Sequence, residues 1–223
     1  RKLELEVDAG VTADQVLADA QGEFERVGRD MFTIARQLWS RFHPGAPLPP
    51  DDPAGRRATV RSVLAAIAQD HSSAETVVAD VRRVVADVKR FIADARILRL
   101  PQPDQCQIIE MPEFQRGNST AYMNSPPPLD PGAGGYYAVS PPPRDWDADR
   151  VRSYFEEYNS QMLRILTIHE AYPGHYVQLE HANRNPSRVR RVLQSGVYIE
   201  GWAVYTEAMM LDQGFGEGSL PLR

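Results

Sequence analysis

The sequence has very little of several features that define common protein classes. Of its 223 residues only Cys106 is a cysteine, so no internal disulfide can form and nothing in the sequence records an oxidising compartment. The longest apolar runs, such as residues 63–68, are far shorter than the roughly 20 residues needed to cross a bilayer. We therefore expect no membrane span, and both a cytoplasmic and an exported location remain open.

An excess of positive charge is also missing. The formal net charge is -5, and the content of apolar residues (42%) and charged residues (25%) is that of an ordinary globular protein. Nucleic-acid-binding proteins usually carry a broad positive field, so the basic stretches at 82–99 and 184–191 are interpreted as solvated helix faces. We expect no nucleic-acid partner, and the sequence does not define an oligomeric state.

The first part of the chain predicts a long helix over residues 12–43. Its apolar residues recur at steps of three and four, and Thr12 with Gln15 matches a capping box at the start. Five prolines between 44 and 53 rule out helix there, and a short helix is expected near 55–70.

A second long helix is predicted by an apolar stripe from Val77 to Leu98, preceded by a possible capping box of Ser72 and Glu75. We expect the two long helices to pack antiparallel, so that residues 1–100 form a helical bundle. The alternative is a coiled coil with a partner, but only about three heptads are sustained.

The remaining chain divides into two parts. Residues 101–148 contain short β-prone runs at 105–111, 120–124 and 135–140, separated by prolines and glycines, which predicts a small antiparallel sheet in a loop-rich segment. Residues 149–223 are predicted to be helical and carry the motifs. We expect one domain over 1–223 that is incomplete at both termini, because the sequence starts without methionine and stops soon after a helix.

The candidate chemistry lies in the segment His169-Glu170-Ala171-Tyr172-Pro173-Gly174-His175. Zinc peptidases commonly use two histidines four residues apart and a glutamate that accepts a proton from water. Here the histidines are six residues apart, which on a regular helix rotates them about 120° from each other. Pro173 should break the helix and Gly174 should allow an unusual turn, which would bring His175 back toward His169.

A zinc site usually has a third protein ligand, and Glu200 is the candidate. Glu207 lies seven residues later and shares a helix face with it, so one of the two acids could bind metal while the other orients a histidine. The alternative for this group of residues is a hydrogen-bonded polar cluster at a helix kink. His43, His71 and His181 stand alone and are interpreted as structural.

These motifs resemble the bacterial family called domain of unknown function 885, whose members are regarded as relatives of the gluzincin metallopeptidases. The resemblance rests on His169-Glu170-x-x-Pro173-Gly174-His175 and on Glu200-Gly201-Trp202-Ala203-x-Tyr205-x-Glu207. The segment Pro112-Glu113-Phe114 and the later Tyr122 also fit the family. Family members are considerably longer than this chain.

The resemblance implies a mainly α, zincin-like fold of long helices with the small sheet near the active site. It also implies a zinc ion held by His169, His175 and Glu200, with Glu170 as general base in peptide hydrolysis. The substrate would be a peptide. Alternatives are a helical protein that binds metal or peptide without catalysis, and a zinc hydrolase of a non-peptide amide or ester.

Groups that could assist the reaction follow from their position in the sequence. The oxyanion of the reaction needs a donor, and Tyr172, Tyr176, Tyr198 and Tyr205 lie near the motifs, although each could equally be a packing residue. The strand that ends in Gly134-Gly135-Tyr136-Tyr137 is a candidate for pairing with an extended substrate.

Overall fold

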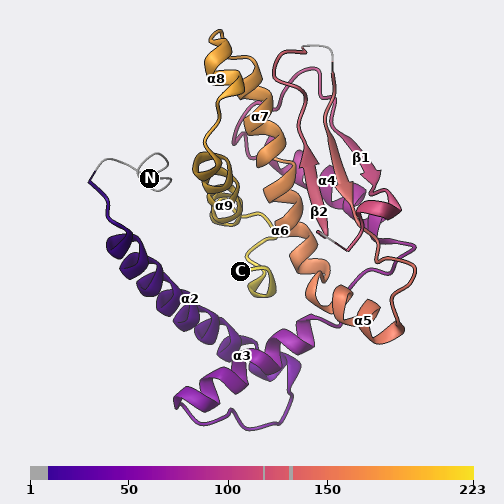
Figure 1. Ribbon diagram of the computed structural model, residues 1–223. Helices are drawn as coiled ribbons and strands as arrows, with labels where there is room; N and C mark the ends of the chain where they lie inside the picture. The colour runs from indigo at the N-terminus through magenta and orange to yellow at the C-terminus, as the bar shows by residue number, and fades with distance from the viewer. Residues whose placement is uncertain (1–9, 118, 131–132) are drawn as a thin grey trace. The chain divides into compact units, whose positions relative to one another are not determined.

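A computed structural model describes residues 10–117, 119–130 and 133–223. The chain forms two compact units (Figure 1). Of the described residues, one unit contains 10–69 with 219–221 and 223, and the other contains 70–117, 119–130 and 133–218 with 222. The residues predicted to bind metal all belong to the second unit.

The first unit is a helix pair. Helix α2 (Ala13–Phe42) starts with the predicted capping box, because Thr12 and Gln15 exchange side-chain to backbone hydrogen bonds. Helix α3 (Pro53–Ile67) is capped by Asp52 and packs on the C-terminal part of α2, where Ala35, Leu38 and Val63 form the core. A short 3-10 turn, η2, spans Leu220–Leu222.

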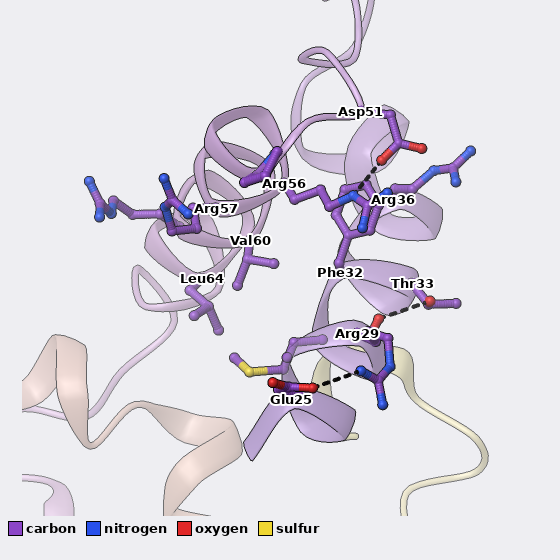
Figure 2. A pocket seen from close by; sticks show the side chains of 14 residues that line it. Glu25, Arg29, Phe32, Thr33, Arg36, Asp51, Arg56, Arg57, Val60 and Leu64 are labelled. Atoms are coloured by element: carbon purple, nitrogen blue, oxygen red, sulfur yellow. Dashed lines mark hydrogen bonds and ion pairs between the residues drawn. The ribbon is translucent and has the colours of Figure 1, made fainter. Parts of the chain in front are cut away.

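A groove of about 980 Å³ opens between α2 and α3 (Figure 2). Phe32, Val60 and Leu64 line its apolar part. The guanidinium of Arg56 pairs with Asp51 at 2.6 Å beside it. None of the residues predicted to bind metal lines this groove.

In the second unit, helix α4 (Val77–Asp94) buries one apolar face. The buried residues are Val77, Val81, Val85, Val88 and Ile92, and they belong to the same core as helix α6 and the sheet. Within the second unit this buried face packs on α6 and on the sheet. The expected pairing of the two long helices stays a prediction. The second capping box was wrong: α4 starts after Thr76, and the Ser72 hydroxyl donates to Asp80 instead.

The sheet has three strands at the predicted places, β1 (Gln107–Glu110), β2 (Ala121–Asn124) and β3 (Tyr136–Val139). Their order is β1-β3-β2, and β3 pairs antiparallel with β2 but parallel with β1. The sheet is thus mixed: the expected antiparallel pairing is present between β2 and β3, whereas β1 pairs parallel with β3. The reason is that β3 inserts between two strands that precede it, so the chain reaches β3 from β1 by way of β2.

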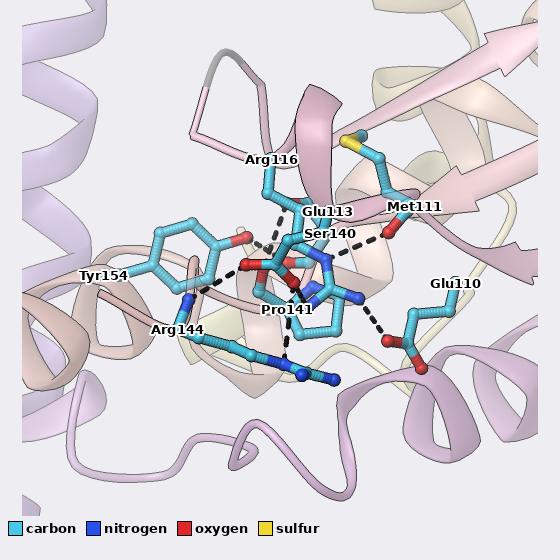
Figure 3. Close-up of polar contacts among 8 residues, drawn as sticks. All are labelled: Glu110, Met111, Glu113, Arg116, Ser140, Pro141, Arg144 and Tyr154. Atoms are coloured by element: carbon cyan, nitrogen blue, oxygen red, sulfur yellow. Dashed lines mark hydrogen bonds and ion pairs between the residues drawn. The ribbon is translucent and has the colours of Figure 1, made fainter. Parts of the chain in front are cut away.

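Ion pairs fix the loops at one end of this sheet (Figure 3). The side chain of Arg116 is only 8% exposed, donates to the Met111 carbonyl at 2.9 Å and pairs with Glu113, which begins the 3-10 turn η1 (Glu113–Gln115). The Tyr154 hydroxyl of the next helix donates to the Ser140 carbonyl at 2.5 Å. The segment that contains Glu113 is therefore tied through Arg116 to the end of β1, and through the Arg144 N–H to the loop that precedes the next helix.

Helices form the rest of the second unit, at α5 (Ala148–Glu157), α6 (Ser160–Glu170), α7 (His175–Asn183), α8 (Arg188–Val192) and α9 (Gly196–Asp212). The start of the helical region predicted from residue 149 onward is divided between α5 and α6, because Asn159 caps a new helix by accepting two backbone N–H groups. Helix α6 packs on α4, on β2 and on α9. Among the described residues, no helix is both long and apolar enough to cross a membrane.

Candidate metal centre

The turn between α6 and α7 has the break that Pro173 and Gly174 predict. Helix α6 ends at Glu170 and α7 starts at His175, with the Gly174 N–H donating to the Ile168 carbonyl at 3.0 Å. A Cβ atom on Gly174 would lie 1.8 Å from the His169 carbonyl oxygen, so only glycine allows the chain to pass there. This tight turn brings the second histidine back beside the first.

The two histidines and Glu200 converge on one point. The Nε2 atoms of His169 and His175 each lie 3.6 Å from the same carboxylate oxygen of Glu200, which comes from α9. One ligand atom from each of the three residues lies within 4.8 Å of the other two. The imidazole rings meet edge to face, with centroids 4.6 Å apart.

The acid seven residues after Glu200 contacts the far side of the first histidine. A Glu207 carboxylate oxygen lies 2.6 Å from Nδ1 of His169. This hydrogen bond is the main reason why the pKa of His169 is raised above its ordinary value. The bond fixes the ring so that Nε2 points toward Glu200, which is the arrangement by which outer carboxylates orient histidine ligands of metals.

His175 has a different environment. Burial, followed by the nearby His169, lowers its pKa, which favours the neutral imidazole that metals bind. Its Nδ1 atom is buried and has no hydrogen-bond partner in the described part of the chain. This ring is therefore held by packing and by the course of the turn, and not by a carboxylate.

Glu170 lies at the end of α6, beside the cluster but outside it. Burial raises its pKa to about 7, against the effects of His169 and of the Met123 backbone N–H that bonds to its carboxylate. A carboxyl group with this pKa can both accept and release a proton near neutral pH. The link to Met123 also places β2 directly beside Glu170.

Two of the four tyrosines suggested from sequence are buried. Tyr172 and Tyr176 are 1% and 0% exposed. The Tyr172 hydroxyl donates to Asp104, and the Tyr176 hydroxyl accepts the Gln105 N–H. Tyr198 and Tyr205 are both 58% exposed on α9, so the role of oxyanion donor stays a prediction for these two.

Sequence reasoning missed three residues that shape the turn. Trp202, for which the sequence indicated no role of its own, donates its indole N–H to the Pro173 carbonyl at 2.9 Å and so ties α9 to the turn. Lys89 and Asp104 lie behind Tyr172. No local pattern indicates them, because they come from α4 and from the segment before β1, 83 and 68 residues away from Tyr172.

The donor set fits a zinc ion. Zinc binds imidazole nitrogen and carboxylate oxygen at about 2.0–2.2 Å in a tetrahedron, which separates neighbouring donor atoms by about 3.3 Å. The two separations of 3.6 Å between imidazole nitrogen and Glu200 are close to this value. Three protein ligands also leave the fourth position that a catalytic site needs.

A solved structure resembles the whole chain. A candidate lipoprotein of unknown function from Shewanella oneidensis is 32% identical, with a TM-score of 0.85. The similarity covers 99% of this chain but 38% of that protein, so this chain spans well under half of its relative. No curated protein matches the sequence.

The family model for bacterial proteins of unknown function called DUF885 matches residues 1–222. The match extends over both compact units and includes all the residues of the candidate metal centre. The chain therefore belongs to the DUF885 family of bacterial proteins of unknown function.

Proposed function

We propose that this chain forms the metal-binding and catalytic part of a zinc peptidase, in which His169, His175 and Glu200 hold the ion and Glu170 is the general base. The observation that carries the proposal is the convergence of both Nε2 atoms on Glu200 at 3.6 Å, with Glu170 adjacent. A zinc ion at this point would lower the pKa of a water molecule to about 7 and polarise a carbonyl group.

Glu170 would perform the proton transfers. Its carboxylate would accept a proton from the attacking water and pass it to the leaving amine, steps that typically contribute about 10²- to 10⁴-fold. Its raised pKa, about 7, suits both transfers, and the Met123 N–H fixes one side of the carboxylate. The raised pKa and the contact with Met123 both belong to Glu170, which is not one of the three proposed zinc ligands.

The free edge of β2 supports a peptide as the substrate. β2 is an edge strand of the described sheet. Ser140 donates its N–H to the Thr120 carbonyl, so the alternation of an antiparallel pair directs the backbone groups of Ala121 and Met123 away from β3. The contact between Met123 and Glu170 agrees with this direction.

The Met123 N–H is already bonded to Glu170, but an extended peptide could pair with the Ala121 backbone groups and the Met123 carbonyl and so present its carbonyl to Glu170. The earlier suggestion that the strand at residues 134–137 binds substrate was wrong, because that strand is β3, which is paired on both sides. A small amide or ester would gain nothing from a free strand edge. This favours a peptide over the other hydrolase substrates.

The alternative of a binding protein without catalysis differs in what it requires of Glu170. Holding a metal or a peptide needs no acid that is buried, uncoordinated and shifted to a pKa of about 7. Burial of such a group costs free energy, which a catalytic role would explain.

The relative from Shewanella oneidensis suggests a location. The similarity to that candidate lipoprotein covers 99% of the length of this chain. We therefore infer that the protein to which this chain belongs acts outside the cytoplasm or at a membrane surface. Fractionation of the native host with an antibody against the chain would test this.

The experiment that tests the function compares metal content and hydrolysis in two matched variants. Glu170→Gln should keep one zinc per chain and lose about 10²- to 10⁴-fold in kcat on a peptide library. Glu180→Gln, on α7 and paired with Arg184, should keep both properties. Protein purified without chelator that contains no zinc, or full hydrolysis by Glu170→Gln, would contradict the proposal.

A further inference from the structure

A polar network lies directly behind the turn that carries His175. The Tyr172 hydroxyl donates to both carboxylate oxygens of Asp104, at 2.8 and 3.0 Å. Lys89 of α4 reaches the same carboxylate, with its Nζ 2.5 Å from Oδ2. The same ammonium lies 5.1 Å from the centre of the Tyr172 ring. Lys89 and Asp104 thus hold Tyr172 by its hydroxyl and by its ring.

The segment that contains Asp104 also holds the residue on the other side of His175. The Gln105 N–H donates to the Tyr176 hydroxyl at 3.0 Å, and the rings of Tyr172 and Tyr176 meet edge to face at 5.4 Å. Residues 173–175 therefore lie between two tyrosines, of which Tyr172 is bonded to Asp104 and Tyr176 to the neighbouring Gln105. This arrangement fixes both ends of the turn to one short segment.

The Asp104 carboxylate is charged in this environment. Burial raises its pKa, but the hydrogen bonds from Lys89 and Tyr172 outweigh burial and bring the pKa below the ordinary value. The pair is only partly buried, with the Lys89 side chain 38% exposed, and such a pair adds little net stability, because solvent screening and desolvation offset the attraction. A phenylalanine at position 172 would fill the same space without any of these polar groups, so packing alone does not explain them.

We propose that Asp104, with Lys89 as its counter-ion, is a positioning residue that fixes Tyr172 and thereby directs the His175 ring toward the zinc ion. The need for such a device follows from the site, because Glu207 orients His169 whereas Nδ1 of His175 has no partner in the described residues. This inference rests on the proposed zinc site. It concerns the binding of metal and not the chemical step.

The test measures zinc affinity by chelator competition in Tyr172→Phe and Asp104→Asn. Loss of groups that orient a ligand typically costs 10- to 100-fold in metal affinity, so we expect a rise in Kd of about that size in both variants. Lys89→Met should have the same effect, and Lys89→Arg should restore most of the affinity because it keeps the charge.

Asp80→Asn is the matched control. Asp80 also accepts from a hydroxyl, that of Ser72 at 2.7 Å, and pairs with a cation, Arg83, but neither partner contacts the metal cluster. The Asp104 and Asp80 side chains are 16% and 20% exposed. The Asp80 variant should lose thermal stability and bind zinc with unchanged Kd.

Cobalt substitution separates positioning from general damage. If His175 is misdirected, the visible bands of the Co²⁺ protein should change in position or intensity in Tyr172→Phe and remain unchanged in Asp80→Asn. Unchanged Kd and unchanged bands in Tyr172→Phe and Asp104→Asn, with a wild-type protein that binds zinc, would overturn this inference alone. A wild-type protein that binds neither zinc nor cobalt would overturn the proposed zinc site and this inference with it.

Discussion

The replacement Gly174→Ala tests whether the turn between α6 and α7 builds the metal site. A Cβ atom at this position would lie 1.8 Å from the His169 carbonyl oxygen and 2.4 Å from the Ile168 carbonyl oxygen. Real Cβ contacts essentially never fall below 3.0 Å, so the closest contact must open by at least 1.2 Å. Both nearest atoms are backbone atoms, and the adjustment must therefore move the turn itself.

A movement of this size is large for a metal centre. Metal–ligand distances tolerate changes of about 0.2 Å, so His175 should no longer reach an ion held by His169 and Glu200. We expect the Kd for zinc to rise by about 100-fold or more, beyond the 10- to 100-fold typical of groups that only orient ligands. Strain of this kind should also destabilise the fold by about 1–3 kcal/mol.

The assay combines chelator competition for zinc with urea unfolding of the metal-free protein, and Gly201→Ala serves as control. Gly201 lies within α9 next to Glu200, and nothing lies within 4 Å of a Cβ built on it. Alanine there should keep zinc affinity and stabilise the helix by about 0.5–1 kcal/mol. Wild-type zinc affinity in Gly174→Ala would refute the reasoning, because the site would then not depend on this turn.

Two further predictions concern charged groups. Glu207→Gln removes the carboxylate that raises the pKa of His169. Zinc affinity should fall by about 10- to 100-fold in chelator competition, and the pKa of His169, measured by NMR in the metal-free protein, should fall as well. Equal affinities and equal pKa values in the variant and the wild type would contradict the role of Glu207. Asp104 has a pKa below its ordinary value of 3.8, so its contribution to stability is fully present above that pH and is lost as the pH falls through the folded-state pKa. Urea unfolding between about pH 5 and pH 3 should therefore show a shallower loss of stability in Asp104→Asn than in the wild type, and parallel curves would contradict this.

Local patterns in the sequence predicted much of the fold. The capping box at Thr12, the positions of the three strands and the break at Pro173 depend on residues close together in the chain, and all are confirmed. The parallel pairing of β1 with β3 and the packing of α4 on α6 and the sheet were not predicted. Both depend on which distant segment offers a surface, and spacing alone does not specify this.

The candidate site likewise contains residues that the sequence predicts and residues that it does not. His169, His175 and Glu200 could be predicted from motif and resemblance, and the structure brings them together. Glu200 was the predicted ligand and Glu207 the acid that could orient a histidine, and the contact of Glu207 with Nδ1 of His169 fits that division. Asp104 and Lys89 could not be predicted, since their relation to the turn exists only after α4, β1 and α7 have packed.

The most direct test of the central claim is diffraction at the zinc absorption edge from crystals of protein purified without chelator. The proposed site predicts one anomalous peak at about 2.0–2.2 Å from Nε2 of His169, Nε2 of His175 and a carboxylate oxygen of Glu200. A zinc-supplemented crystal with no peak at these three residues, or with the peak on other side chains, would contradict it.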